Sequence, residues 1–300
     1  MTRDSDDGLR RLAAVLERIE ARLPAYEAAD LAASIAFRWR KRRFLGIEQG
    51  ELQAVAQPAL IAFDDLKHVD AQIDEIRNNT ERFVRGLPAN NVLLTGARGT
   101  GKSSLIRACL HAFAAQGLRL IEVDKRDLID VADIVDRVAS RPQRVIVFCD
   151  DLSFDMSEGG YKELKAALDG SIAGAADNVL IYASSNRRHL MPELMRDNLA
   201  TRYDEDGEIH PSEAIEERVS LSERFGLWLS FYPFRQDDYL DIAAHWLARL
   251  GSTPQQISMA RAEALQFALQ RGSRSGRVAL QFARHWAGRQ QLSGADATAR

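Results

Sequence analysis

The sequence predicts an α/β protein with a parallel sheet, preceded and followed by helical segments. Five short apolar runs lie between residues 90 and 234: "NNVLLT", "LRLIEVD", "RVIVFCDD", "NVLIYASSN" and "GLWLSFYPF". Each run is apolar on both faces, and connections of helix length separate the runs. This combination is typical of a parallel sheet that helices cover on both faces.

Apolar residues at helical spacing predict a helical N-terminal region over residues 1–58. Within it, residues 9–44 predict two helices that are separated by Pro24. Residues 46–58 predict a connector to the next domain.

An α/β core is predicted over residues 59–234 and begins with a helix over 64–86. Beyond Pro233 the helical spacing returns, which predicts a helical C-terminal domain over residues 235–300. Its helices are expected near residues 235–250, 256–271 and 277–290, separated by "GSTP" and "RGSRSG".

The composition is that of an ordinary globular chain. Hydrophobic residues make up 46% and charged residues 28% of the 300 residues. Lys and Arg number 40 against 43 Asp and Glu, for a formal charge of -3, so the whole chain is not a general polyanion binder. Any basic function must be local.

The cysteines and the termini favour a cytoplasmic location. Cys109 and Cys149 each lie in an apolar segment, which indicates buried thiols in a reducing compartment. The N-terminus lacks the apolar region of a signal peptide, and no apolar run reaches the ~20 residues of a membrane span. We therefore expect no membrane partner.

The stretch "GARGTGKSS" lies between a predicted strand and a predicted helix and fits G-x-x-x-x-G-K-[ST]. Such a turn directs backbone N–H groups and a helix N-terminus at phosphate oxygens. We expect Lys102 to reach the β- and γ-phosphates and the Ser103 hydroxyl to ligate Mg²⁺. The alternative is a chance match. The residues expected around the phosphates are Gly96, Ala97, Arg98, Gly99, Thr100, Gly101, Lys102, Ser103 and Ser104.

Polar residues follow two of the predicted strands. Asp150 would hold Mg²⁺, directly or through water, and Asp151 would orient or deprotonate an attacking water. Asn186 would polarise that water or sense the γ-phosphate. The alternatives are solvated aspartates that open a turn, and an asparagine that caps one.

Two arginines downstream are candidates for phosphate chemistry. Arg224, before the fifth strand, would supply positive charge during phosphoryl transfer. Arg277, at a helix start, would contact phosphate from the C-terminal domain. For each, a solvated surface arginine is the alternative.

In this order, the motifs resemble those of the AAA+ ATPase family over about residues 60–290. The segments "VIVFCDDLSFD", "YKELKAALDGS", "YASSNRRHLMPE" and "LSERFGLWLSFYPF" are similar, more narrowly, to a bacterial family named domain of unknown function 815. The resemblance implies a P-loop NTPase fold with five strands in the order 5-1-4-3-2 and a C-terminal helical lid.

The same resemblance implies roles for single residues. It makes Lys102 and Asp151 catalytic, Asn186 the first sensor and Arg277 the second. It makes Arg224 an arginine finger that acts in trans, which implies a homo-oligomer. The cofactors implied are ATP and Mg²⁺.

One departure from the AAA+ pattern concerns Asp151, because Glu is usual at this position. The side chain is one methylene shorter, so hydrolysis could be slow. Adenine is favoured over guanine because no N-K-x-D motif follows the sensor strand, and the base is expected near Leu66 and Val69.

Two further segments have open interpretations. "FRWRKRRF", residues 37–44, suits nucleic-acid phosphates and bases, but an amphipathic helix end with solvated arginines is favoured. The acidic residues 204–217 invite a metal site, yet their spacing does not fit a calcium loop, which indicates a solvated loop.

The sequence thus predicts a Mg²⁺-dependent AAA+ ATPase that couples nucleotide state to lid and subunit movement and acts on an unknown protein or nucleic acid. The alternative is a slowly hydrolysing switch or scaffold that recruits a partner, possibly DNA through Arg40, Lys41 and Arg42. A small-molecule kinase is less favoured, since no acceptor pocket is marked.

Overall fold

The computed structural model describes residues 11, 13–15, 18, 30–44, 47–152, 160–169, 176–186, 202–203, 209–210 and 221–298. Two compact units make up the chain, Met1–Asp30 and Leu31–Arg300, and the second contains the sheet. Within the described ranges, no helix combines the length and the apolar character that crossing a membrane requires. A cytoplasmic location stays a prediction.

The second unit is built around a seven-stranded sheet in the order β2-β1-β4-β5-β6-β3-β9. Neighbouring strands are parallel except β1 and β2, which form an antiparallel hairpin. Val92, Leu93 and Leu94 are fully buried, so the centre of the sheet is covered on both faces. The strands are β1 (Ala36–Phe44), β2 (Ile47–Ala54), β3 (Val92–Gly96), β4 (Leu118–Val123), β5 (Arg144–Cys149), β6 (Val179–Ser185) and β9 (Leu227–Phe231).

The parallel α/β class is confirmed, but the predicted sheet is wrong in strand number and therefore in its full order. The five predicted strands follow one another as β9-β3-β6-β5-β4. This is the predicted order 5-1-4-3-2. The prediction lacks β1 and β2, which extend the sheet beyond β4.

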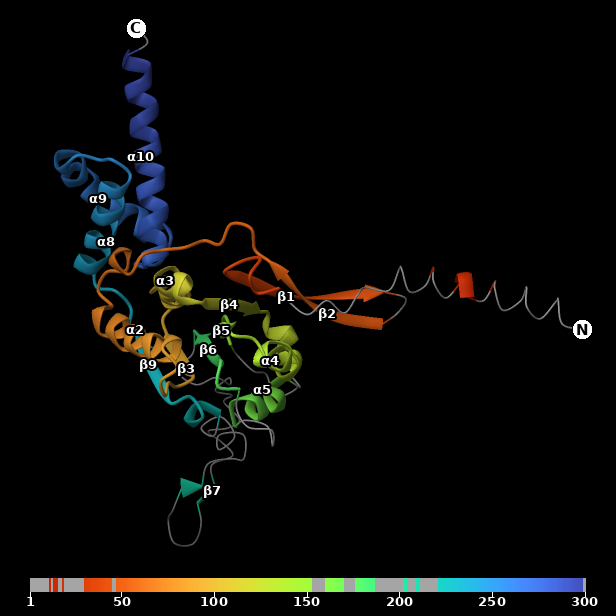
Figure 1. The fold of residues 1–300 in the computed structure, drawn as a ribbon. Coiled ribbons are helices and arrows are strands. Elements are labelled where there is room, and N and C mark those ends of the chain that lie inside the picture. Colours follow the sequence, from red (N-terminus) through yellow and green to blue (C-terminus); the bar gives the residue numbers. More distant parts are fainter. Residues whose placement is uncertain are drawn as a thin grey trace, which may run out of the picture. The chain divides into compact units, whose positions relative to one another are not determined.

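Helices cover both faces of the sheet, with α2 and α3 on one side and α4 and α5 on the other (Figure 1). Alternate strand residues such as Leu94, Ile146 and Tyr182 form one core cluster with α2 and α3. The helices are α2 (Asp70–Val84), α3 (Lys102–Phe113), α4 (Val131–Ala139) and α5 (Gly160–Asp169), with short 3₁₀ turns η1 (Phe63–Asp65), η2 (Ala114–Gln116) and η3 (Lys125–Asp130).

The helix and connector predicted up to residue 58 are wrong for residues 36–54, which form the β1–β2 hairpin. Phe37 and Trp39 are only 3% and 2% exposed, while Arg38 and Arg40 alternate with them on the opposite face. This period of two marks a strand. A run with so few apolar residues fits the helical period of 3.6 almost as well. The hydrophobic pattern alone therefore could not distinguish a strand from a helix here.

A glycine on β2 makes room for the buried indole of β1. We expect Gly50→Ala to destabilise the protein by about 1–3 kcal/mol, because a Cβ there would lie 1.8 Å from Cζ2 of Trp39. Thermal unfolding measures the effect. Gly288→Ala is the control, since its Cβ would meet nothing within 4 Å, and an equal melting temperature for both variants would contradict this packing.

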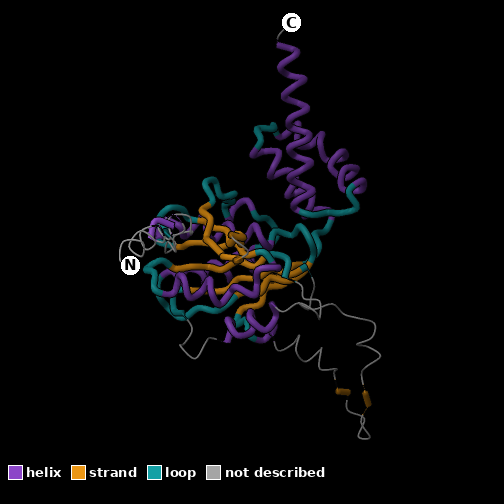
Figure 2. The backbone as a smooth tube through the Cα atoms, turned by 90° about the vertical axis from the view of Figure 1, so that its right-hand side faces the viewer, coloured by secondary structure: helices purple, strands orange, loops and turns teal. Residues whose placement is uncertain are grey.

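Three C-terminal helices lie together in a helical domain (Figure 2). Their buried side chains form a separate core cluster. They are α8 (Gln236–Arg249), α9 (Pro254–Gln270) and α10 (Gly276–Thr298). Their positions confirm the predicted helices, and α10 continues beyond its predicted end. Thr253 caps α9 through a reciprocal bond with Gln256, and Pro254 follows at the first helical position. The domain boundaries at residues 58 and 234 stay predictions.

Candidate functional site

The turn between β3 and α3, residues 96–101, is here called the glycine-rich loop. A Cβ at Gly96 would lie 1.9 Å from the Phe231 carbonyl oxygen, so only glycine allows β9 to approach this closely. Gly101 has φ 105° and begins α3 without a side-chain cap. The first N–H groups of α3 are therefore available to an anionic ligand.

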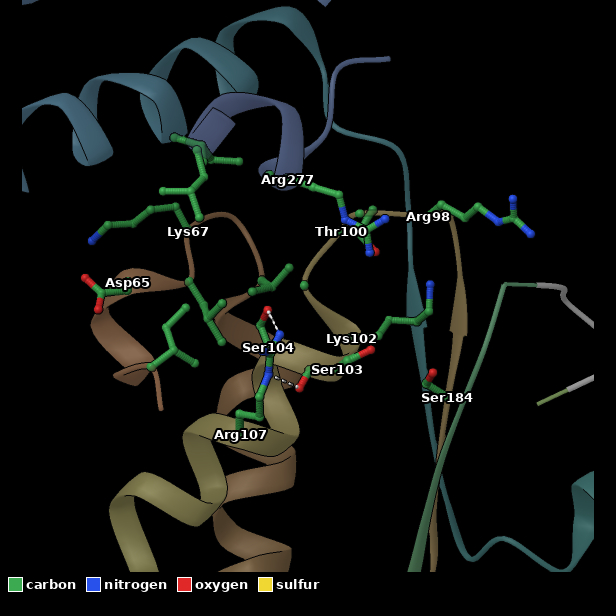
Figure 3. Close-up of a pocket in the computed structure, with 18 of the residues that line it drawn as sticks. Asp65, Lys67, Arg98, Thr100, Lys102, Ser103, Ser104, Arg107, Ser184 and Arg277 are labelled. Carbon is green, nitrogen blue, oxygen red and sulfur yellow. Dashed lines mark hydrogen bonds between the residues drawn. The ribbon is translucent and has the colours of Figure 1, made fainter. Parts of the chain in front are cut away.

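A cavity of about 510 Å³ lies beside this loop, at the carboxyl ends of the central strands (Figure 3). It brings together residues from the loop, from the ends of β5 and β6, from the segment before α2 and from the helical domain. Its lining includes Leu66, Val69, Arg98, Gly99, Thr100, Gly101, Lys102, Ser103, Ser104, Asp150, Asp151, Ser184, Asn186 and Arg277. Most of the residues that the sequence predicts for the site thus meet in one place.

Lys102, at the start of α3, is 5% exposed. Its Nζ donates hydrogen bonds to the carbonyl oxygens of Gly96 and Ala97, both at 2.8 Å, and to Oδ1 of Asn186 at 3.0 Å. Backbone carbonyl groups of the glycine-rich loop thus hold the Lys102 ammonium group in place.

Burial lowers the pKa of Lys102 to about 8. The cations Arg277 and Arg98 add to this lowering, whereas the carboxylates of Asp150 and Asp151 oppose it. A poorly solvated cation among further cations is stabilised by an anion, so the charge around this cavity favours an anionic ligand.

Asp150, directly after β5, receives hydrogen bonds on a single oxygen. Ser103 Oγ donates to Asp150 Oδ1 at 2.7 Å, and Ser184 Oγ donates to the same atom at 2.5 Å. A serine hydroxyl beside a carboxylate is an oxygen donor set that suits Mg²⁺. Ser103 and Asp150 therefore fit the Mg²⁺ ion that the sequence predicts at this site.

Asp151 has φ 53°, in the left-handed region that Asp enters more readily than most residues. Asn186 Nδ2 donates to Oδ1 of Asp151, and Asn186 Oδ1 accepts from Lys102. A hydrogen-bonded chain thus joins the ammonium group to the Asp151 carboxylate.

The helical domain contacts the glycine-rich loop through the start of α10. Gly276 N–H donates to the Gly99 carbonyl oxygen at 2.9 Å, and a Cβ at Gly99 would lie 2.8 Å from Ser275. Figure 3 shows Arg277 directed from α10 towards Thr100. A ligand that changes the conformation of the loop would therefore also change its contacts with the helical domain.

A second contact joins η1 to α8. Asp65, which is 8% exposed, forms an ion pair with Arg249, whose Nε lies 3.3 Å from Asp65 Oδ1, and the same oxygen lies 3.0 Å from His245 Nε2. The sequence analysis did not identify this cluster, because the three residues are separated by about 180 positions and carry no local pattern. Ser184, within "YASSN", was missed as well.

Arg224 does not lie at the cavity. It precedes β9, whose first residue pairs with Val92 at the amino end of β3, whereas the cavity lies at the carboxyl ends of the strands. Its Nε donates to Oδ1 of Asp169 on α5 at 2.5 Å. Arg224 cannot serve the cavity of its own chain from this position.

Three of the five basic residues of β1 are paired with acids. Arg38 lies 2.9 Å from Glu122, and Lys41 Nζ lies 3.0 Å from Asp130. Arg42 Nε lies 2.5 Å from Glu51 of β2. Local pairing of this kind lowers the positive potential that nucleic-acid binding at residues 37–44 would require.

The acidic segment 204–217 lies outside the described residues except for 209–210. These two form the short strand β8 (Ile209–His210), which pairs with β7 (Arg202–Tyr203) in an antiparallel ribbon. Among the residues described, no cluster of three or more His, Cys, Asp or Glu side chains is placed to hold a metal ion. A Mg²⁺ ion shared with bound phosphates needs no such cluster.

A family model described as "Protein of unknown function (DUF815)" matches residues 32–290. The chain belongs to this family. The match spans the sheet, the cavity and most of the helical domain, so every site residue named above lies within the matched range.

Three further proteins are similar to this chain at low sequence identity. A 26S proteasome regulatory subunit 4 homolog of Oryza sativa subsp. japonica is 28% identical over 169 residues, which are 47% of this chain and 38% of that subunit. A solved variant of Thermotoga maritima RuvB is 13% identical with a TM-score of 0.50, covering 74% of this chain and 63% of that one. A chain of the E. coli MS115-1 HORMA:CdnC:Trip13 complex has 14% identity and a TM-score of 0.46, with coverages of 74% and 89%.

The RuvB likeness concerns the fold alone: this DUF815 chain has the fold of AAA+ P-loop ATPases. It spans well under two thirds of the length of the proteasome relative. The site geometry therefore has to support any function assigned to it.

Proposed function

We propose that this protein is a Mg²⁺-dependent ATPase of the AAA+ type, in which nucleotide state controls the position of the helical domain as a lid. The observation that supports this most is the convergence of Lys102, Ser103 and Asp150 on one cavity at the start of α3. The distant AAA+ relatives make ATPase activity the natural assignment.

Each residue has a defined task in this proposal. Lys102 offers positive charge to the β- and γ-phosphates, and Ser103 with Asp150 holds Mg²⁺. When bound, Mg²⁺ neutralises negative charge on phosphate oxygens. Asp151 accepts a proton from the attacking water, and Asn186, which already bonds to Asp151, orients that water or its base.

Lid movement is proposed from the Gly276–Gly99 contact and from Arg277. Arg277 lies on α10 and lines the cavity. Bound phosphates would attract its positive charge and so hold the helical domain against the loop. Adenine is proposed to lie near Leu66 and Val69, which line the same cavity.

A homo-oligomer is part of the proposal. Arg224 lies at the sheet edge opposite its own cavity, so it could act only on nucleotide held by another copy. The client is an unidentified protein or nucleic acid. The ion pairs of β1 count against DNA as a ligand of residues 37–44.

A slowly hydrolysing switch is the second candidate. The observation that favours it is Asp151, whose short side chain is bonded to Asn186 and so is not directed freely at a water. In that case ATP binding would move the lid and recruit a partner, with little turnover.

ATP affinity tests the binding part of the proposal. We expect Lys102→Met to weaken ATP binding by about 10- to 100-fold, the equivalent of ~1.5–3 kcal/mol for hydrogen bonds to a charged group. The ligand-free variant should melt no lower than wild type, because a desolvated cation is removed. Isothermal titration calorimetry measures the affinity, with exposed Lys125→Met as control. Equal ATP affinity in all three proteins would refute the site.

The lowered pKa of Lys102 predicts a pH dependence of nucleotide binding. Bound phosphates would raise this pKa again, so above pH 8 binding requires uptake of a proton and affinity falls as pH rises. ADP binding in EDTA between pH 7 and 9.5 should weaken by up to about tenfold per unit in the upper part of this range. Lys102→Arg, which stays charged, should show a flat profile. A parallel decline in both proteins would exclude Lys102 as the cause.

A further inference from the structure

Ser184 is a buried hydroxyl that lies at the cavity and has no role in the scheme above. It is the sixth residue of β6 and is 2% exposed. Asn186 lies two positions further along the chain, just beyond the end of β6, and lines the same cavity. Ser184 thus borders the two aspartates that follow the neighbouring strand β5.

Three hydrogen bonds join Ser184 to consecutive residues after β5. Its Oγ donates to Asp150 Oδ1 at 2.5 Å and accepts from the Asp151 N–H at 3.1 Å. Its carbonyl oxygen accepts from the Leu152 N–H at 2.6 Å. One residue therefore fixes the Asp150 carboxylate and also the backbone at Asp151, where φ is 53°.

The same bonds decide which oxygen of Asp150 can approach a cation. Oδ1 accepts from Ser103 Oγ at 2.7 Å, from Ser184 Oγ at 2.5 Å and from the Asp151 N–H at 3.1 Å. A carboxylate oxygen has two lone pairs, and three donors already share them. Oδ2 is then the atom that can face a cation or one of its waters.

We infer that Ser184 is a positioning residue for the metal site: it holds Asp150 so that Oδ2 faces the cation, and it holds the turn that separates the metal-side carboxylate from that of Asp151. The inference rests on the proposed Mg²⁺ and nucleotide site. Loss of the Ser184 hydroxyl is therefore expected to lower metal affinity more than it lowers the free energy of unfolding.

The test is Mn²⁺ binding to the ADP-saturated protein, measured by electron paramagnetic resonance. Ser184→Ala should weaken Mn²⁺ binding by about tenfold, as loss of one hydrogen bond to a charged group predicts, and leave ADP affinity in EDTA unchanged. Ser184→Thr, which keeps the hydroxyl, should recover most of the Mn²⁺ affinity. In steady-state assays, excess Mg²⁺ should restore turnover to Ser184→Ala and not to Asp151→Asn.

Thr80→Val is the matched control, because it removes another buried hydroxyl, bonded to Ile76 and Tyr182 and away from the cavity lining. If Ser184→Ala melts lower but binds Mn²⁺ as wild type does, Ser184 is merely structural and the inference is wrong. If wild type binds no ADP with or without metal, the proposed function fails, and the inference with it.

Discussion

Replacing Arg224 with alanine is expected to lower ATP turnover by about 10³-fold and to leave ATP affinity unchanged. A positive charge that reaches the transferring phosphoryl group from outside is worth ~10³ to 10⁵ in rate in GTPases. Arg224 lies at the amino ends of the strands and bonds to Asp169, so it does not contact nucleotide in its own chain. Phosphate release at saturating ATP measures the loss.

A mixing experiment shows whether Arg224 acts in trans. Arg224→Ala subunits keep an intact cavity, and Asp151→Asn subunits keep an intact arginine. An equimolar mixture should therefore regain turnover that neither variant has alone. No recovery in a mixture that forms mixed oligomers, or full activity of Arg224→Ala alone, would remove the arginine finger from the proposal.

Asp151→Asn is the second large effect, with an expected loss of about 10²- to 10⁴-fold in turnover, the usual contribution of a positioned general base. The amide cannot accept the proton from water. ATP affinity should stay equal or rise, because a negative charge beside the phosphates is removed. Asn tolerates the left-handed backbone as Asp does, so the melting temperature should not change. Unchanged turnover would transfer the role of base to another group.

Asp151→Glu separates the backbone from the carboxylate. Glu restores the residue usual in AAA+ proteins but fits φ 53° less well, at a cost of about 1–2 kcal/mol. We expect a lower melting temperature with the carboxylate retained. A Glu variant as stable as wild type would show that backbone conformation does not explain Asp at this position.

The parts of the site that sequence predicted are those with local causes. Gly96, Gly101 and Lys102 are required within one turn by backbone conformation and by the start of α3, so a short motif contains the whole signal. Asp150 and Asn186 follow buried strands, and parallel strands end at the same sheet edge.

The parts that sequence did not predict depend on contacts between distant segments. β1 is a strand because Trp39 packs over Gly50 and donates to Asp130, 91 positions away. The Asp65–His245 contact and the bonds of Ser184 to Asp150 are likewise tertiary. Arg224 was predicted as a candidate from its place before the fifth strand. That it lies away from the cavity follows from the register of β9 on β3, which the sequence does not reveal.

The most direct test of the ATPase assignment is steady-state phosphate release from Mg·ATP, measured over a wide range of protein concentration for wild type and Asp151→Asn. The proposal predicts turnover per subunit that rises with concentration in wild type, as a site completed by a neighbour requires, and that is absent in the variant. ATP binding without turnover at every concentration would contradict the ATPase assignment and leave the switch.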